Sequence, residues 1–269
     1  MSWVTFDHGN SSLKWGLWRR DEDGRSLLRA RGQLGHVTDP AEWRELEETL
    51  SAHPVEGALY CGVAGAEAAE RVREAWTRLA PRATWSEPEA SLSNDCVSPD
   101  QVGRDRLMAA CGAFSVLQAS VIIVDAGSAL TVDALSIRDS ADPPCFLGGA
   151  IAPGPAALAA ALGAAGAQLF VVDPSPEDAA LGRSTETSLA AGVTVGFAGA
   201  AARLVQEVSL EAGLEEAAIV ITGGGRSFLS RPGLFEGREL HVYEDLVHAG
   251  LLAAAGESFR LEEEMWGSA

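Results

Sequence analysis

The sequence contains few cysteines, and none is spaced for metal binding. Cys61, Cys96, Cys111 and Cys145 are far apart, and no two of them form a CxxC pair. Structural zinc sites and small disulfide frameworks depend on closely patterned cysteines. The sequence therefore predicts neither of these, and it indicates reduced thiols in a cytoplasmic protein.

Basic residues are also scarce. The 269 residues include 38 aspartates and glutamates but only 20 lysines and arginines, so the formal net charge is −18, and the chain has no basic run. Nucleic acids and acidic membranes attract positive surfaces, so we expect neither as a partner. The N-terminus lacks a basic segment followed by an apolar run, and the alanine-rich stretches are interrupted before membrane-spanning length. A small anionic substrate remains compatible, because a metal ion, glycine-rich backbone or a helix N-terminus can bind it locally.

The hydrophobic pattern instead predicts an α/β protein with strands and helices in alternation. Its apolar and turn residues indicate strands at 3–7, 13–20, 26–33, 57–64, 145–151 and 217–222. They indicate helices at 41–51, 67–79, 104–118, 184–212 and 245–257, and another helix opened by Pro153 and Pro155. The loop at 171–178, which contains two prolines, is interpreted as a surface lid or an interface segment.

The beginning of the chain recurs in its middle. "VTFDHGNSSLKW" starts at residue 4 and "VIIVDAGSALTV" at residue 121, each an apolar strand, an Asp-x-Gly turn with a hydroxyl, and a second strand. This predicts a duplicated domain, with halves at 1–118 and 119–269 facing each other across a cleft. Asp7 and Asp125 would both point into that cleft, and such carboxylates suit Mg²⁺ or a monovalent cation. The alternative is that each aspartate caps its own turn.

The side chains around these turns suit a phosphorylated ligand. Asn10, Ser11, Ser12 and Ser128 offer amide and hydroxyl groups beside backbone N–H groups, which can bind phosphate oxygens. Lys14 would add a point charge. A solvated strand lysine is the simpler alternative.

A third motif, Gly-Arg-Asp-Arg at 103–106, stands where a loop becomes a helix. Asp105 there suits a general base, and Arg106 suits a carboxylate ligand. An aspartate favoured by the helix dipole beside surface arginines explains the same residues. Farther along, Thr185 could contact substrate, or Ser184 or Thr185 could simply cap a helix.

Taken in order, DHGNSSLK, GRDR, DAGSALTVD, GGAIAPG, STETSLAAG and TGGG resemble the motifs of the type III pantothenate kinases. These enzymes belong to the acetate and sugar kinase, Hsp70 and actin superfamily. The resemblance implies two ribonuclease H-like (actin-like ATPase) domains with mixed β-sheets flanked by helices. It also implies ATP-dependent phosphorylation of pantothenate to 4'-phosphopantothenate, the first step of coenzyme A biosynthesis, by a homodimer with the substrate site near its interface.

The resemblance further implies a role for each matching residue. Asp7 would position Mg²⁺, Asp105 would be the catalytic base, and Asp125 would bind K⁺ or NH₄⁺. The ATP-binding residues would be Asp7, His8, Gly9, Asn10, Ser11, Ser12, Leu13, Lys14 and Ser128. The pantothenate-binding residues would be Cys96, Gly103, Arg104, Asp105, Arg106 and Thr185.

Four positions depart from the family pattern. Ser11 and Ser128 stand where the family usually has threonine, so the hydroxyl is kept. Cys96 replaces a tyrosine that usually lines the pantothenate pocket, and Arg104 replaces a small or apolar residue. The last two leave two alternatives open: a non-catalytic nucleotide-binding or regulatory relative, or a kinase for another small hydroxyl compound.

Overall fold

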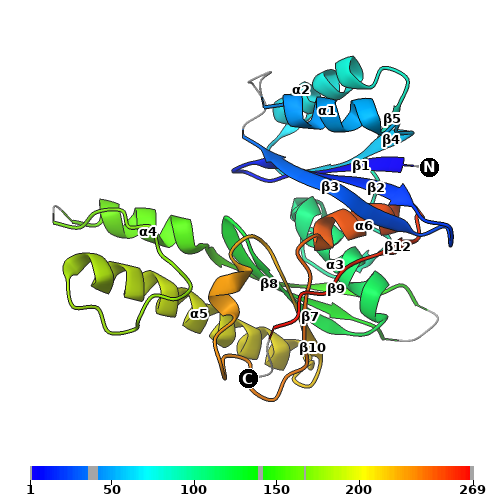
Figure 1. Cartoon of the computed structure of the whole chain (residues 1–269). Coiled ribbons are helices and arrows are strands. Elements are labelled where there is room, and N and C mark those ends of the chain that lie inside the picture. The colour runs from blue at the N-terminus through cyan, green and yellow to red at the C-terminus, as the bar shows by residue number, and fades with distance from the viewer. Residues whose placement is uncertain (1, 36–41, 139–141, 167, 267–269) are drawn as a thin grey trace. The chain divides into compact units, whose positions relative to one another are not determined.

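The computed structural model describes residues 2–35, 42–138, 142–166 and 168–266, which form two compact units (Figure 1). Unit 1 comprises Met1–Ser93, Val97–Gln118 and Asp245–Glu262. Unit 2 comprises Asn94–Cys96, Ala119–Glu244 and Glu263–Ala269. Each unit is an α/β domain built on one mixed six-stranded sheet.

The sheet of unit 1 has the strand order β12-β3-β2-β1-β4-β5. Its strands are β1 (Ser2–His8), β2 (Leu13–Arg20), β3 (Ser26–Leu34), β4 (Gly57–Gly62), β5 (Thr84–Ser86) and β12 (Phe259–Arg260). The first three form an antiparallel meander, and β4 then pairs in parallel with β1. The helices are α1 (Arg44–Ala52), α2 (Ala66–Leu79), α3 (Arg104–Leu117) and α6 (Leu246–Ala254), and a 3-10 turn, η1 (Pro99–Gln101), precedes α3.

Strand alternation gives the unit 1 sheet two different faces. Phe6, Trp15 and Tyr60 point to one face, where they form a buried core with Leu46 of α1 and Trp76 of α2. The helices α3 and α6 pack on each other and contact β1 and β4, and in Figure 1 they lie on the other side of the sheet from α1 and α2. The polar members of the first motif are therefore separated from the aromatic core.

The sheet of unit 2 repeats this topology, with the order β11-β10-β7-β8-β9-β6. Its strands are β6 (Ser93–Asn94), β7 (Val121–Ala126), β8 (Ala129–Ser136), β9 (Cys145–Pro153), β10 (Ala218–Thr222) and β11 (Leu240–Val242). The meander β7-β8-β9 corresponds to β1-β2-β3, and β10 pairs in parallel with β7 as β4 does with β1. The duplicated α/β fold predicted from the two Asp-x-Gly turns is confirmed.

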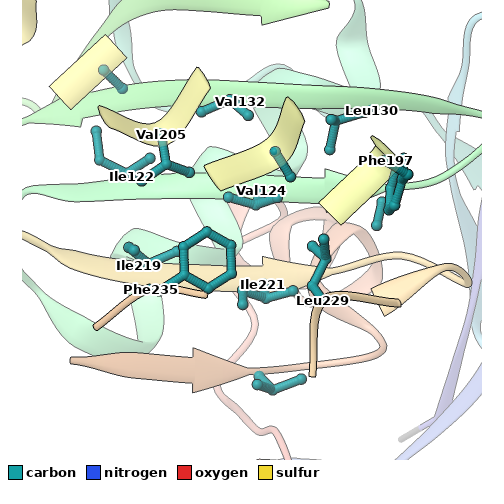
Figure 2. Packing of buried hydrophobic residues seen from close by; sticks show 14 residues of the cluster. Ile122, Val124, Leu130, Val132, Phe197, Val205, Ile219, Ile221, Leu229 and Phe235 are labelled. Atoms are coloured by element: carbon teal, nitrogen blue, oxygen red, sulfur yellow. The ribbon is translucent and has the colours of Figure 1, made fainter. Parts of the chain in front are cut away.

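The core of unit 2 lies between its sheet and the long helix α5 (Thr185–Ala212). Figure 2 shows Phe197 and Val205 of α5 against Ile122, Val124 and other strand residues. The remaining regular elements of the unit are α4 (Pro155–Ala164) and the 3-10 turn η2 (Arg226–Leu229). Within the described residues, α5 alone has the length and apolarity of a membrane span, but half of its most apolar window is buried in the unit.

Most predicted elements are present, with corrections at their ends. The strand expected to extend to residue 64 ends at Gly62, and Pro153 ends β9, so only Pro155 opens α4. The last helix stops at Ala254 because Gly256, with φ of 76°, turns the chain shortly afterwards. Residue 41, the predicted start of α1, lies outside the described residues, and α1 itself begins at Arg44.

Candidate functional site

Three polar side chains of unit 1 share one face of its sheet. Asp7 pairs with Lys14 of β2 on one side and with Cys61 of β4 on the other. Directly paired residues project from the same face. Because Phe6 and Trp15 point into the core with α1 and α2, the three polar side chains lie on the face toward α3 and α6.

Lys14 is the only lysine in the sequence, and every other residue with a basic, permanently charged side chain is an arginine. Its side chain is half-buried. An ammonium is a compact, rotatable point charge, whereas a guanidinium is a planar fork. We interpret the single lysine as a position that needs a point charge beside Asp7.

Asp7 lies in an environment that disfavours its charged form. Burial raises the pKa of Asp7 to about 6, Lys14 acts against this shift, and the nearby carboxylate of Asp105 adds to it. A bound cation would offset both the desolvation and the repulsion between these carboxylates. Mg²⁺ is usually held by one or two carboxylates together with substrate phosphates, so the residues present fit this ion.

The turn between β1 and β2 consists of residues 9–12, because His8 pairs with Leu13 at its base. Asn10 and Ser11 are exposed, and the other two turn residues are half-buried. The turn therefore presents amide, hydroxyl and backbone groups to solvent. This arrangement fits a phosphate-binding loop.

The two residues at the base of the turn differ from it. Leu13 is fully buried in the core, and the Nδ1 atom of His8 forms a 2.9 Å hydrogen bond with the hydroxyl of Tyr60. His8 is also buried. Of the predicted ATP-binding residues, these two can offer a ligand little beyond their backbone groups.

Asp105 is the second residue of α3, and its carboxylate folds over the start of this helix. Its Oδ1 atom accepts a 2.8 Å hydrogen bond from the backbone N–H of Arg106. A Cβ atom on Gly103 would lie 2.5 Å from the same Oδ1, so the glycine provides the space for the carboxylate. This close approach gives a physical reason for the glycine in the Gly-Arg-Asp-Arg motif.

Arg104 points toward a different segment. Its Nη1 atom lies 3.2 Å from Oε2 of Glu87, and its Nη2 donates a 3.0 Å hydrogen bond to the carbonyl of Pro88. Glu87 also accepts a hydrogen bond from the indole of Trp85. In this conformation Arg104 ties the start of α3 to residues 85–88.

Sequence reasoning assigned no role to Cys61, which the strand register places beside Asp7. The thiol is buried, and burial raises its pKa, with Asp7 and Asp105 adding to the shift. A buried thiol with a raised pKa is a poor nucleophile. Only the pairing of β1 with β4, which is non-local, could have revealed this neighbour.

In unit 2, Asp125 lies against a glycine loop at the carboxyl ends of two parallel strands. Asp125 of β7 pairs with Thr222 of β10, and Gly223 follows with a φ of 91°. A Cβ atom on Gly223 would lie 2.4 Å from Oδ1 of Asp125. The backbone N–H of Gly225 also donates a 2.7 Å hydrogen bond to the carbonyl of Ala126. Only glycine permits both this φ and this approach to the carboxylate.

A second glycine segment meets the same turn. The backbone N–H of Gly154 donates a 3.2 Å hydrogen bond to the carbonyl of Ser128, and a Cβ atom on Gly154 would lie 2.3 Å from the carbonyl oxygen of Gly127. Ser128 itself is exposed. The fold therefore brings the glycine segments at 147–154 and 221–228 to the second Asp-x-Gly turn.

At the start of α5, the capping residue is Ser184. Its side chain accepts a hydrogen bond from the backbone N–H of Thr187, whose hydroxyl in turn accepts one from the backbone N–H of Ser184. This reciprocal pair is a capping box. Capping therefore does not explain the exposed hydroxyl-bearing Thr185.

Cys96 belongs to unit 2, beside strand β9. Its backbone N–H donates to the side-chain oxygen of Asn94, and its sulfur lies 3.4 Å from where a Cβ atom on Gly148 would stand. The thiol is free and half-buried, and this small side chain lies near Gly148. All four cysteines are free thiols, as the sequence indicated.

Some of the predicted residues thus form a polar group in each unit. Unit 1 brings together Asp7, Lys14 and Asp105, and unit 2 brings together Asp125, Ser128 and the glycine loops. Among the described residues, no cluster of three or more histidine, cysteine, aspartate or glutamate side chains forms a protein-only metal site.

Known proteins resemble this chain over most of its length. A family model described as type III pantothenate kinase matches residues 3–207. A type III pantothenate kinase of Paracidovorax citrulli is 32% identical over 97% of this chain and 100% of its own length. One from Acidovorax ebreus is 32% identical over 96% of this chain and 98% of its own length. A solved structure from Sinorhizobium meliloti, provisionally named 2-dehydro-3-deoxygalactonokinase, has a TM-score of 0.52 at 16% identity, covers 99% of this chain and 100% of its own, and supports the fold alone.

Proposed function

This chain belongs to the type III pantothenate kinase family, and we propose that it transfers the γ-phosphoryl group of ATP to a hydroxyl of pantothenate. The product would be 4'-phosphopantothenate, and the reaction would be the first step of coenzyme A biosynthesis. The match extends over nearly the whole chain, and the family motifs occur in order along it.

The observation that carries this proposal is the group formed by Asp7, Lys14 and Asp105. Two carboxylates and the only lysine of the chain lie close together in unit 1, at the end of β1 and the start of α3. Phosphoryl transfer depends on cations that neutralise developing charge and on a group that orients the nucleophile. Lys14 is such a cationic group, and Asp105 would orient the nucleophile.

The roles follow from the chemistry. Asp105 would accept the hydroxyl proton of pantothenate while the hydroxyl oxygen bonds to the γ-phosphorus, and the bond from this phosphorus to the β–γ bridging oxygen of ATP would break to release ADP. Lys14 would offset charge on the transferring group. Asp7 would hold Mg²⁺, which when bound neutralises phosphate charge. The exposed 9–12 turn would contribute N–H and hydroxyl donors to the ATP phosphates.

The residues of unit 2 would bind the second cation and part of the nucleotide. Asp125, half-buried against the glycine loop, suits a monovalent cation such as K⁺ or NH₄⁺, since a carboxylate and nearby backbone carbonyls are hard oxygen ligands. Exposed Ser128 would contact ATP. The close packing of Gly154 and Gly223 around this turn supports both roles, because it brings backbone carbonyls of residues 126–128 and the Asp125 carboxylate close together.

Pantothenate itself would be held by residues of several segments. Arg106 suits its carboxylate, because a guanidinium can bind a carboxylate through two parallel hydrogen bonds. Thr185 is exposed and is not the helix cap, which supports a ligand-binding hydroxyl there. Gly103, Arg104 and Cys96 complete the proposed set, with Arg104 acting through its ties to residues 87–88.

The experiment that tests this function is ADP release by the purified protein with Mg-ATP and K⁺, with and without pantothenate. We expect pantothenate-dependent release, and we expect Asp105→Asn to reduce turnover by roughly 100-fold or more. Asp100→Asn, in η1 just upstream, is the matched control and should keep full turnover. Near-wild-type turnover of Asp105→Asn would overturn the assignment of the base. Wild-type protein that releases no ADP in the presence of pantothenate would overturn the proposed kinase activity.

Cys96 favours a second candidate, a kinase for a different small hydroxyl compound. Where the family usually has a tyrosine, a half-buried thiol lies against Gly148, so an apolar contact and a phenolic hydrogen bond are lost. A screen of ADP release over small alcohols and hydroxy acids separates the two. Faster turnover with another acceptor than with pantothenate would favour this second candidate, and ATP binding without turnover on any acceptor would indicate a non-catalytic relative.

A homodimer is also proposed, and unit 2 offers a surface that suits it. Gly192, Val195 and Gly196 are exposed at helical spacing on α5, and the apolar side chains of Phe170, Val171 and Leu181 are exposed in the same unit. The two glycines expose the backbone of α5, which allows close approach of another helix, and exposed apolar groups of this kind are typical of interfaces. Sedimentation equilibrium should give twice the chain mass for the wild type and monomers for Val195→Asp.

We further propose that the protein is cytoplasmic, because its four cysteines are free thiols, three of them buried, with no disulfide among the described residues. Expression with a fluorescent tag and fractionation of the host cell tests the location.

We also propose that the two duplicated halves of the sequence meet between residues 118 and 119.

A further inference from the structure

Arg226, the first residue of η2, is held from three directions. Its Nε donates a 2.6 Å hydrogen bond to Oε2 of Glu264, and its Nη2 donates a 2.9 Å bond to Oε2 of Glu244. Its Nη1 donates a 3.2 Å bond to the carbonyl of Gly223. The side chain is only 17% exposed, so these contacts use most of the fork of donors on a partly desolvated guanidinium.

The carbonyl bound by Arg226 belongs to the glycine that touches Asp125. Gly223 has a φ of 91°, and its Cα lies so close to Asp125 that a Cβ atom would be 2.4 Å from Oδ1. The backbone N–H of Gly225 holds the other end of the loop to the carbonyl of Ala126. The Gly223 carbonyl also accepts a 3.2 Å hydrogen bond from the backbone N–H of Arg226. Because glycines have no side chains to hold them in place, the backbone and side chain of Arg226 together restrict the 223–225 loop.

One of the carboxylates that hold Arg226 comes from a distant part of the chain. The segment Glu263–Trp266, here called the strap, lies along β11, with the backbone N–H of Glu264 bonded to the carbonyl of Val242. Glu263 contacts the imidazole of His241 at 2.9 Å and the hydroxyl of Tyr243 at 3.4 Å. Trp266 packs against the core of unit 2 and donates from its indole to Glu264.

We propose that Arg226, held by Glu244 and by Glu264 of the strap, is a positioning residue that fixes the 223–225 loop beside Asp125 and thereby sets the affinity for ATP and for the monovalent cation. The inference rests on the proposed function, in which Asp125 and Ser128 bind these ligands. The motifs that carry the resemblance include neither the strap nor Arg226, and both also lie outside residues 3–207, which the family model matches.

The first test replaces Arg226 with a side chain of similar length and no charge. We expect Arg226→Met to raise KM for ATP and the half-saturating K⁺ concentration by about 5- to 20-fold, with KM for pantothenate changed less than 2-fold. Calorimetry with a non-hydrolysable ATP analogue should show a similar increase in Kd without any turnover. Arg226→Lys, which can keep one contact but not the fork, should fall between wild type and Arg226→Met.

A control variant separates this role from general support of unit 2. Arg238 also donates to backbone carbonyls in unit 2, at Ala217 and Leu214, but on the far end of β10 from the glycine loop. Arg238→Met should lower the melting temperature while leaving both ATP Kd and the K⁺ requirement unchanged. An increase in ATP Kd as large as that of Arg226→Met would show that any lost guanidinium in unit 2 weakens nucleotide binding, and would overturn the inference.

A double-mutant cycle tests the link to the strap without removing Arg226. Glu264→Gln should raise ATP Kd about 2- to 4-fold in the wild type and cause no further change in Arg226→Met, because its effect passes through the guanidinium. Additive effects would overturn the link. If wild-type protein binds no ATP analogue, the proposed function fails; if it binds and Arg226→Met binds equally well, only this inference fails.

Discussion

At the scale of single residues, Asp7 combines a functional position with a cost in stability. Its folded-state pKa of about 6 is above its ordinary value of 3.8, because burial disfavours the carboxylate. The folded protein therefore binds a proton more tightly than the unfolded chain between these two values. Its stability falls as pH rises from about 4 to about 6, and the full loss persists above that range.

Asp7→Asn should remove this cost together with the activity. Without ligands, the variant is expected to be more stable than wild type by about 1–3 kcal/mol at pH 8, because the neutral amide needs no buried charge. At pH 4 the difference should shrink to less than about 1 kcal/mol, since Asp7 is then protonated in the folded protein and partly protonated in the unfolded chain. Urea unfolding at the two pH values checks this, and a variant less stable than wild type at pH 8 would contradict the burial argument.

His248 has the opposite pH dependence. Burial lowers the pKa of His248 to about 3, with Lys14 and Arg31 adding to the shift, and its Nδ1 atom has no hydrogen-bond partner among the described residues. Below its ordinary pKa of 6.5 the unfolded chain takes up a proton that the folded protein does not. Stability is therefore full above pH 6.5 and decreases by about 1.4 kcal/mol per pH unit below it.

We expect His248→Gln to weaken this acid sensitivity. Between pH 7 and pH 4.5 the variant should lose about 2 kcal/mol less stability than wild type, because glutamine does not titrate. The free energy of unfolding in urea at both pH values gives the comparison. Equal losses in the two proteins would mean that other groups dominate the acid response.

At the scale of elements, two glycines determine how α3 and α6 pack. A Cβ atom on Gly250 of α6 would lie 1.8 Å from the carbonyl oxygen of Met108, and one on Gly112 of α3 would lie 2.3 Å from that of Leu246. Each contact is with backbone, which cannot rotate away. Because α3 carries Asp105 in its first turn, this packing also supports the proposed base.

Two Gly→Ala substitutions should therefore have opposite effects. Gly250→Ala is expected to destabilise unit 1 by about 3 kcal/mol, since the methyl group meets a carbonyl. Gly199→Ala in α5, where a Cβ atom meets open space, should stabilise by about 0.5–1 kcal/mol because alanine favours a helix. Thermal unfolding of both variants provides the test, and a neutral Gly250→Ala would show that the two helices can shift apart.

The sequence predicted the long elements because each carries its own signal. The Ser184 cap of α5 and the apolar runs of β1 and β7 are local features. The short strands β5, β6, β11 and β12 have two or three residues and form only because a neighbouring strand is present. Nothing local indicated that 245–262 returns to unit 1, since this depends on Gly112 and Gly250 meeting.

The same distinction applies to the candidate site. Asp7, Asp105 and Asp125 could be proposed from the sequence because each stands in a short motif at an element boundary. The surroundings of Cys61 and Arg226 could not be predicted, because they depend on strand pairing and on contacts with Glu264, far away in sequence. The assignment of His8 and Leu13 followed the motif, whereas strand alternation alone would have indicated that Leu13 points into the core.

At the scale of the whole molecule, the chain is a strongly negative protein whose proposed substrates are anions. The net charge of −18 repels Mg-ATP at long range, and the cations that attract it act only locally. The screening length shortens from about 30 Å at 10 mM salt to about 10 Å at 100 mM. The long-range repulsion should therefore be screened before the local attraction.

Association with ATP should accordingly become faster as salt is added, which is the reverse of ordinary electrostatic steering. We expect the association rate constant of a fluorescent ATP analogue to rise a few-fold between 10 and 100 mM ionic strength at constant Mg²⁺ and K⁺. Stopped-flow fluorescence measures it. A rate that falls with salt would show that the field around the binding residues is already positive.

Because the sequence has a single lysine, the proposed phosphate site can be labelled selectively. Reagents that modify amines have only two targets in this sequence, the α-amino group and Nζ of Lys14. Reductive methylation with ¹³C-formaldehyde would thus place one side-chain NMR reporter in the whole protein, directly beside Asp7. The chemical shift of this methylated lysine would report nucleotide binding without any amino-acid substitution.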